Sequence, residues 1–343
     1  MKKCIIFHLF AFLLFSCQNK DIEKSLIDDF SFNVPLVNNI DDLLSDNVRI
    51  IKLDTLTEAF VGNVNKIIKH DNCFYILSDE KRILHFDNNG KFLSTINKIG
   101  GGPDEYSRLM DFDIYNSNGN TEIWIRDYKA IKKYELYDNE WNFKGNIDFD
   151  FVINKFKIIS DNHIIFVTGQ NEEILMLTDI TGNKISGFLK KEIPFIIERP
   201  IQFINYDSCI VFQLGISNEC VALDTKKKTF EHINITNNEN FYTSKNLLDL
   251  FDKLHQNFIS EISKINCIRG FSKVNGNILL EYHYNGELFI AINKSGTWKR
   301  MKIDVKNNFS TATFGVSESL DSFISFDYPE EDDQNLVLYE YIQ

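Results

Sequence analysis

The residues best suited by type to do chemistry lie in the stretch NKIGGGPDEYSRL, residues 97–109, where three glycines and a proline precede Asp104 and Glu105. Adjacent carboxylates could act as a general acid and base, and a glycine-rich loop could bind a phosphate. A phosphate-binding loop leads into a helix and carries a lysine followed by serine or threonine. Here SRLMDFDIY follows, which alternates like a strand, so the residues argue against a phosphate loop.

Other residues with chemical potential are scattered along the chain. The acidic run at 330–333 could bind calcium, but it lacks the alternating ligand spacing of a calcium loop, so a solvated turn is favoured. The histidines occur singly, without an HExxH pattern, and no GxSxG motif is present. The weak catalytic candidates are therefore Glu105, Asp104 and His255, and we predict neither a metal nor a cofactor.

The N-terminus, MKKCIIFHLFAFLLFSCQNK, has the pattern of a signal peptide, with two lysines, an apolar run and the small residue Ser16 before Cys17. The apolar run, residues 5–15, is too short to span a bilayer, which takes about 20 residues. LFSC resembles the bacterial lipoprotein box, which implies cleavage after residue 16 and lipid on Cys17. Residues 17–47 would then form a lipidated tether and a lead-in. The alternative is a plain secretory signal.

Charge and cysteine content limit the partners. Removing residues 1–16 leaves 35 basic and 49 acidic side chains, a formal net charge of −14, which argues against nucleic acid. The charged stretch after Cys17 resembles signals that send lipoproteins to the outer leaflet, so we expect lipid anchoring at the outer membrane, with exposure at the cell surface as a further option. The remaining cysteines lie in apolar runs and read as buried small hydrophobes, with a disulfide left open: Cys73, Cys209, Cys220 and Cys267.

The chain contains an internal repeat. ILHFDNNGKFLSTI (83–96), ILMLTDITGNKISGFL (174–189) and LFIAINKSGTWKRMKI (288–303) each read as strand, Asp or Asn, two residues, Gly, strand. This order suits a hairpin, because Asp and Asn bond their own backbone and glycine supplies a positive φ. Two copies, at 134–147 and 221–235, keep the strands and lose the glycine. Four short strands per repeat of this length are typical of propeller blades.

The repeat predicts an all-β protein, a six-bladed β-propeller with four-stranded antiparallel blades. Five complete blades cover about 64–96, 109–147, 155–189, 200–235 and 268–303. A sixth begins with TATFGV (311–316), continues with SFISF and LVLYEYI, and ends one strand short. The strand at 48–54 should complete it, because an open ring would leave an unpaired sheet edge. Residues 48–343 are therefore expected to form a single domain.

The pattern resembles the six-bladed β-propeller lipoproteins of gut-type bacteria, relatives of the NHL-repeat propellers, whose hallmark is G-x-G-P-G-E-Y after the first blade. The matching residues here are Gly100, Gly101, Gly102, Pro103, Asp104, Glu105 and Tyr106. Asp104 stands where the family has its third glycine, so no catalytic group shared by the family could occupy that position. The resemblance covers most of the chain from residue 48 onward.

We interpret the glycine stretch as the connector between the first two blades, with a positive φ at Gly101 or Gly102. The same face should gather the loop 327–335 and the insertion 236–267, which reads as helix over about 244–265 and could cover one side of the central channel. The ligand-face candidates are Gly102, Pro103, Glu105, Tyr106, Glu330, Glu331, Asp332 and Asp333.

The resemblance implies a non-enzymatic binding or scaffold propeller for a glycan, peptide or protein partner. We expect it to be a monomer. The alternative is a glycan-acting lyase or hydrolase that uses carboxylates at the channel mouth, a choice that the fold does not decide.

Overall fold

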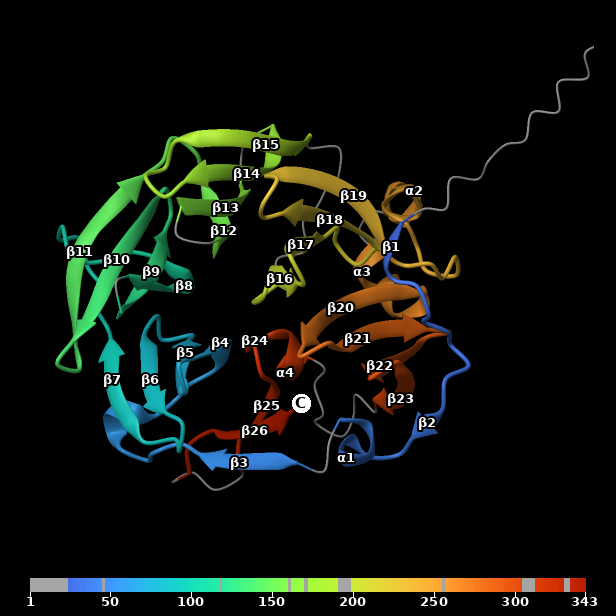
Figure 1. Ribbon diagram of the computed structural model, residues 1–343, viewed down its shortest axis with the longest axis horizontal. Coiled ribbons are helices and arrows are strands. Elements are labelled where there is room, and N and C mark those ends of the chain that lie inside the picture. Colours follow the sequence, from blue (N-terminus) through green and yellow to red (C-terminus); the bar gives the residue numbers. More distant parts are fainter. Residues whose placement is uncertain are drawn as a thin grey trace, which may run out of the picture.

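A computed structural model describes residues 24–44, 47–117, 119–159, 162–169, 172–190, 199–254, 257–303, 312–329 and 334–343. Six small sheets stand in a ring (Figure 1), which confirms the expected all-β, six-bladed propeller. Within these ranges no helix is long and apolar enough to cross a membrane.

Five of the sheets each contain four consecutive strands that pair antiparallel with their neighbours. Blade 1 has β4 (Val64–His70), β5 (Cys73–Ser78), β6 (Ile83–Asp87) and β7 (Phe92–Ile96). Blade 2 has β8 (Leu109–Ser117), β9 (Asn120–Asp127), β10 (Ala130–Tyr137) and β11 (Glu140–Asp148). Blade 3 has β12 (Ile153–Ile159), β13 (His163–Thr168), β14 (Glu173–Asp179) and β15 (Lys184–Lys190). Blade 4 has β16 (Phe203–Tyr206), β17 (Cys209–Gln213), β18 (Glu219–Asp224) and β19 (Thr229–Thr236), and blade 5 has β20 (Cys267–Val274), β21 (Asn277–Tyr284), β22 (Glu287–Lys294) and β23 (Thr297–Ile303).

The repeated hairpin turn forms as its residues predict. In blade 1 the Asp87 carboxylate accepts the backbone N–H groups of residues 89 and 91, at 2.8 and 2.9 Å, and Gly90 has φ +87°. In blade 2, where the glycine is missing, Asp138 and Asn139 adopt left-handed φ values of 49° and 60°. These two residue types enter the left-handed region more readily than most, which explains why the degenerate copy still turns.

The N-terminal strand closes the ring. The sixth sheet has the order β25 (Ser322–Asp327), β26 (Val337–Ile342) and β3 (Val48–Lys52), and β3 pairs antiparallel with β26. The expected strand TATFGV is wrong, because residues 312–315 form the short helix α4 (Ala312–Gly315). The following β24 (Ser317–Glu318) pairs in parallel with β4 of blade 1. The Val316 carbonyl accepts the Ile67 amide at 2.8 Å, so this segment satisfies its backbone on blade 1.

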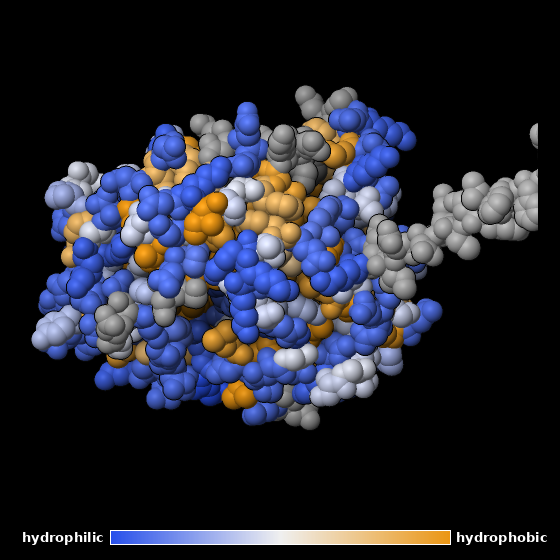
Figure 2. Space-filling view, turned by 45° about the horizontal axis from the view of Figure 1, so that its top comes forward, coloured by the Kyte–Doolittle hydropathy of each residue, from blue (hydrophilic) through white to orange (hydrophobic). Residues whose placement is uncertain are grey.

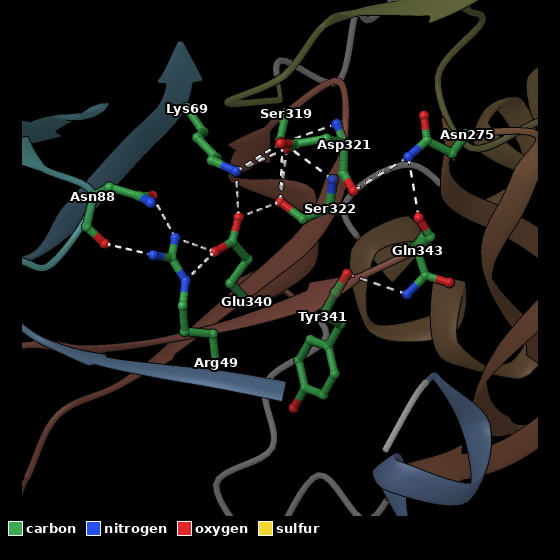
Figure 3. A network of polar contacts seen from close by, with 10 residues as sticks. All are labelled: Arg49, Lys69, Asn88, Asn275, Ser319, Asp321, Ser322, Glu340, Tyr341 and Gln343. Carbon is green, nitrogen blue, oxygen red and sulfur yellow. Dashed lines mark hydrogen bonds and ion pairs between the residues drawn. The ribbon is translucent and has the colours of Figure 1, made fainter. Parts of the chain in front are cut away.

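A polar network fixes this closure (Figure 3). Arg49 of β3 donates from Nε to Glu340 Oε2 of β26 at 2.8 Å and also bonds the Asn88 carbonyl at 2.9 Å. Lys69 of β4 contacts Glu340 as well, and pairs with Asp321 at 2.8 Å. Burial alone would raise the pKa of Glu340, but the hydrogen bonds from Lys69 and Arg49 outweigh it and hold the pKa below its ordinary value. The Glu340 carboxylate on β26 therefore connects β3, the strand that closes the ring, with β4 of blade 1.

The lead-in from residue 24 packs along the ring. β1 (Ser25–Ile27) pairs in parallel with β19, and β2 (Leu36–Val37) pairs in parallel with β23. Between them, Phe30 and Phe32 are buried in the core that blades 4 and 5 share. The helices α1 (Ile40–Leu43) and η1 (Thr57–Ala59) flank β3 along the chain. This segment therefore covers two sheet edges, while the predicted tether at 17–23 lies outside the described residues.

The insertion before blade 5 is helical, as expected, with α2 (Ser244–Leu254), α3 (Phe258–Glu261) and η4 (Ile262–Lys264). Its apolar side chains Leu247 and Phe258 pack against Ile216 and Cys267. Figure 1 shows α2 outside the ring beside β19. The described part of the insertion therefore does not cover the central channel, contrary to the expectation.

Candidate functional site

The glycine-rich stretch is the connector between β7 and β8. The Glu105 carboxylate holds its turn, because Oε2 accepts the Gly102 amide at 2.7 Å. A Cβ atom on Gly100 would lie 1.9 Å from that oxygen, so glycine makes room for the carboxylate. The expected positive φ at Gly101 or Gly102 is wrong, since neither residue adopts one. Close approach of a side chain, and not a left-handed backbone, explains the need for glycine here.

Hydrogen bonds from two tyrosine hydroxyl groups join the connector to both neighbouring blades, and the first comes from Tyr106. Its side chain is buried and its hydroxyl donates to the Lys81 carbonyl at 2.9 Å. From blade 2, the Tyr134 hydroxyl donates to the Asp104 carbonyl at 2.9 Å. The stretch therefore has the connector role that its composition indicates.

The other predicted site residues do not gather around a common centre in the described part of the chain. Asp104 is exposed, with Lys98 Nζ 4.0 Å from its Oδ2, and neither Asp104 nor Glu105 lines the cavity described below. Gly102 and Pro103 lie on the same connector. Cys17, His255 and the acidic run 330–333 lie outside the described residues.

The four cysteines that the sequence left open are free thiols: Cys73, Cys209, Cys220 and Cys267. Cys220 and Cys267 are buried, as their apolar surroundings predict. Burial raises the pKa of Cys267 to about 12, so its thiol is protonated at neutral pH and is a poor nucleophile.

Charged side chains fill the channel beside blades 1 to 3. Lys66 of β4 pairs with Asp111 of β8 at 2.9 Å, and Lys157 of β12 pairs with Glu318 of β24. Asn205 of β16 donates to the same Glu318 at 3.1 Å. The space left among these groups is about 10 Å³, room for a single water at most. This side of the channel is therefore closed by paired charges.

A larger cavity, of about 290 Å³, lies beside the paired charges and between blades 4, 5 and 6. Its walls come from the inner strands β16 and β20 and from α4 and β24. Apolar side chains form much of the lining, among them Ile201, Phe203, Phe271, Val274, Phe314 and Val316. Its size is near the lower end for ligand pockets, which span roughly 300–1,000 Å³.

The outer surface is less distinctive than this cavity. Figure 2 shows one face on which hydrophilic side chains predominate and hydrophobic side chains reach the surface in patches between them. Such exposed apolar residues are ordinary in folded proteins, whereas a mostly apolar hollow with a few charged groups has the usual form of a ligand site. The cavity is therefore the stronger candidate for a binding site.

Five charged side chains line the cavity: Arg199, Arg269, Lys273, Glu281 and Glu318. Lys273 pairs with Asp207 at 2.7 Å and Glu318 pairs with Lys157, which leaves the other three without an ion pair among the described residues. Arg199 precedes β16, Arg269 lies in β20 and Glu281 lies in β21. The Arg199 guanidinium donates to Gln213 Oε1 and to the Gly215 carbonyl, both neutral acceptors. Arg269 sits where the register between β20 and β21 shifts, a bulge that can redirect a side chain. Arg269 forms no hydrogen bond or ion pair with the residues that the structure describes.

Glu281 is buried at 7% exposure, and its Oε1 has no hydrogen-bond partner in the described ranges. A Cβ atom on Gly270 would lie 3.8 Å from Glu281 Oε2 and 3.9 Å from Arg199 Nη1. The carboxylate and the guanidinium therefore flank the same backbone position without pairing to each other. Buried polar atoms normally have a partner, and Glu281 Oε1 is among the exceptions in the described ranges.

Burial raises the pKa of Glu281 to about 7, although Arg269 and Arg199 act in the opposite direction. Burial also lowers the pKa of Arg199 to about 10, which leaves it charged at neutral pH. His283 lies two residues after Glu281, on the same face of β21. Burial and the charge of Arg269 lower its pKa to about 4, so its imidazole is neutral at pH 7. The net charge of Arg199, Arg269 and Glu281 is thus between +1 and +2 near pH 7.

Sequence reasoning missed Arg199, Arg269 and Glu281. One signal was present, because Glu281 interrupts the apolar run of NILLEYHY. Burial of a single carboxyl in an apolar strand is costly, so such a residue is a candidate for a functional role. The described residues contain no group of three or more His, Cys, Asp or Glu side chains that could hold a metal.

The arrangement defines a six-bladed β-propeller with a hollow beside its axis that is mostly apolar and carries a small charged cluster. The chain belongs to the family described as domain of unknown function DUF4934, which matches residues 33–343.

Two solved structures share the fold. One is a Bacteroides fragilis protein described provisionally as exported, at 15% identity and a TM-score of 0.68, with 92% of this chain and 99% of that chain covered. The other is a member of the DUF4221 family from Bacteroides vulgatus, at 11% identity and a TM-score of 0.57, with 88% and 97% covered. No curated protein sequence matches the chain.

Proposed function

We propose that this protein is a non-enzymatic binding propeller of the cell envelope that holds its ligand in the cavity between blades 4, 5 and 6. The observation that carries the proposal is an apolar hollow of about 290 Å³ in which neither Glu281 nor Arg269 forms a hydrogen bond or ion pair with a described residue. A mostly apolar pocket with a few converging polar groups is the usual form of a ligand site. The ligand is a small glycan, a peptide or a segment of a protein partner.

The alternative, a glycan-acting lyase or hydrolase, is less well supported by the geometry. Glycoside hydrolysis generally uses two carboxyl groups on either side of the scissile bond. The Glu105 carboxylate is bonded within its own connector, whereas Glu281 faces Arg199 and Arg269. A binding role therefore accounts for more of the site.

The envelope location rests on the signal-like N-terminus and on the lipoprotein box at Cys17. The description of the similar Bacteroides fragilis protein as exported agrees with it. Cells grown with labelled palmitate should label the wild type and not Cys17→Ser. Equal labelling of both would remove the lipid anchor from the proposal.

Two glycine variants test whether the ligand occupies the cavity. Gly315 lines the cavity and Gly101 lies on the exposed connector, and a Cβ atom on either meets nothing within 4 Å. Gly315→Leu should therefore fill part of the cavity with little strain, and Gly101→Leu is the matched control. The mature chain carrying Cys17→Ser would be screened for thermal stabilisation against arrays of glycans, peptides and small acids.

We expect a ligand that stabilises the wild type and the Gly101→Leu variant but not Gly315→Leu. A ligand that stabilises all three proteins equally would place the binding site elsewhere on the ring. A compound that is cleaved during the assay would favour the enzyme alternative.

A further inference from the structure

We infer that the cavity binds a ligand that presents a carboxylate to Arg199 and Arg269 and an apolar group to the walls formed by β16, β20 and α4. The inference rests on the proposed function and names the chemistry of its ligand, which is either a peptide, as proposed above, or a free apolar acid that presents the same groups. Its basis is the combination of an apolar hollow with two arginines that form no ion pair, and one buried carboxyl that forms no hydrogen bond, within the described part of the chain.

The arginines supply the recognition of the anion. A guanidinium has five N–H donors in a planar fork that matches the two oxygens of a carboxylate. Arg199 is held in place by Gln213 and by the Gly215 carbonyl, which leaves its positive charge uncompensated by a direct partner. Arg269 has all its donors available to a ligand, because no described residue bonds it.

The charge balance favours a monoanion. At pH 8 Glu281 is mostly ionised in the free protein, so it and the two arginines carry a net charge of +1, and one carboxylate makes the site neutral. A doubly charged phosphate would leave a net negative charge in a poorly solvated place unless Glu281 took up a proton, which costs free energy at this pH. Octyl phosphate is therefore a useful competitor to compare with octanoate.

The volume sets the size of the apolar group. The cavity of about 290 Å³ lies near the lower end of the range for ligand pockets, roughly 300–1,000 Å³, so it suits a small ligand. A medium-chain fatty acid fits this space, and so does the apolar side chain at the free C-terminus of a peptide. Both sources share the same chemistry, a carboxylate next to an apolar group.

Glu281 makes the binding depend on pH. An ionised Glu281 repels the ligand carboxylate, so the complex favours the protonated form and takes up a proton. The other groups with a shifted pKa keep their state between pH 6 and 8: Arg199 stays charged, His283 stays neutral and Cys267 stays protonated. The remaining charged groups of the lining are Arg269, and Lys273 and Glu318, which are already paired with Asp207 and Lys157. Octanoate stays ionised in this range, because simple carboxyl groups titrate near pH 4 to 5. Affinity for octanoate should therefore rise as the pH falls from 8 to 6.

Isothermal titration of the mature chain carrying Cys17→Ser tests the inference. We expect octanoate to bind at least tenfold more tightly than 1-octanol, which lacks the charge, and than propionate, which lacks the chain. At pH 8, where Glu281 is mostly ionised, octanoate should also bind more tightly than octyl phosphate. Arg269→Gln should weaken octanoate binding at least tenfold, since it removes charge-assisted hydrogen bonds. Arg108→Gln is the matched control, because Arg108 is also exposed but lies beside Tyr128 on blade 2, and it should leave the affinity unchanged.

Glu281→Gln gives a readout that a purely structural role would not produce. The variant should bind octanoate more tightly than the wild type at pH 8 and should lose the pH dependence. Tripeptides that end in leucine, with a free or an amidated C-terminus, show which source the site prefers. Stronger binding of the free peptide than of octanoate would assign the carboxylate to a peptide end, and the reverse to a free acid.

Equal binding of octanoate and 1-octanol, or an unchanged affinity in Arg269→Gln, would overturn the inference. A different ligand that binds the wild type and is lost in Gly315→Leu would then leave the proposed binding function intact. Failure of the inference and failure of the proposed function are therefore separate outcomes.

Discussion

Replacing Glu281 by glutamine should make the protein more stable at neutral and alkaline pH, although it removes a polar group from the candidate site. Glutamine keeps the shape of the side chain and cannot ionise. In the wild type, burial raises the pKa of Glu281 from an ordinary 4.5 to about 7. The folded state thus holds a proton that the unfolded state releases over this range, so the stability of the wild type falls as the pH rises from 4.5 to 7.

The magnitude follows from the same two pKa values. One pKa unit corresponds to about 1.4 kcal/mol, so the full shift costs the wild type about 3 kcal/mol above pH 7. Below pH 4.5 both states are protonated and the cost disappears. The difference in unfolding free energy between Glu281→Gln and the wild type should therefore be below about 1 kcal/mol at pH 5 and about 3 kcal/mol at pH 8.

Urea unfolding followed by tryptophan fluorescence at pH 5, 6, 7 and 8 measures this difference. The pair at pH 5 is the internal control, because there the wild-type carboxyl is mostly protonated in the folded state. A difference that does not change with pH would refute the reasoning. So would a variant that is less stable than the wild type at pH 8, since that result would mean that ionised Glu281 is stabilised by the arginines more than burial costs it.

Three further substitutions test the fold, each by urea unfolding. Gly100→Ala should cost about 1 kcal/mol, because the new Cβ displaces the Glu105 carboxylate from its hydrogen bond; an unchanged midpoint would contradict this. Glu340→Ala should cost about 3 kcal/mol or more, since it leaves two cations at the ring closure without their shared anion, and a loss below 1 kcal/mol would argue against that role. Phe30→Ala should cost about 3 kcal/mol, whereas Leu36→Ala, at a side chain 55% exposed, should cost little; similar losses for both would mean that the lead-in is not part of the core.

The propeller could be predicted because its signals are local and repeated. In a hairpin turn such as Asp87 to Gly90, the Asp87 carboxylate bonds the backbone of the same turn and Gly90 adopts the positive φ. Such a turn can therefore be predicted from its own few residues. The same local reasoning gave a wrong prediction for TATFGV, where a helix stands in place of the expected strand. Its β-branched and aromatic residues favour a strand, but Phe314 packs with Phe323 and Tyr341, and the backbone that follows bonds to blade 1. Tertiary contacts outweighed local preference there.

The candidate site was much harder to predict. Arg199, Arg269 and Glu281 come from a connector and two strands, with about 70 residues between the first two, and no spacing rule relates them. A pattern of alternating residues shows which face of a strand is buried, but it does not show which blades leave a space between them. The acidic connector around Glu105 attracted attention because its residues are adjacent in sequence. Its carboxylate proved to serve the turn.

The cavity follows from the one irregular blade. In blades 1 to 5 a complete antiparallel strand lines the channel, whereas blade 6 contributes α4 and the two residues of β24. Because β24 pairs with β4 of blade 1, the inner part of blade 6 is drawn toward that side. On the opposite side no strand of blade 6 pairs with β20 in the described part of the chain, and the 290 Å³ hollow opens between them. The same segment that helps to close the ring thereby leaves room for a ligand. Variants that extend β24 should then reduce binding even where they stabilise the fold.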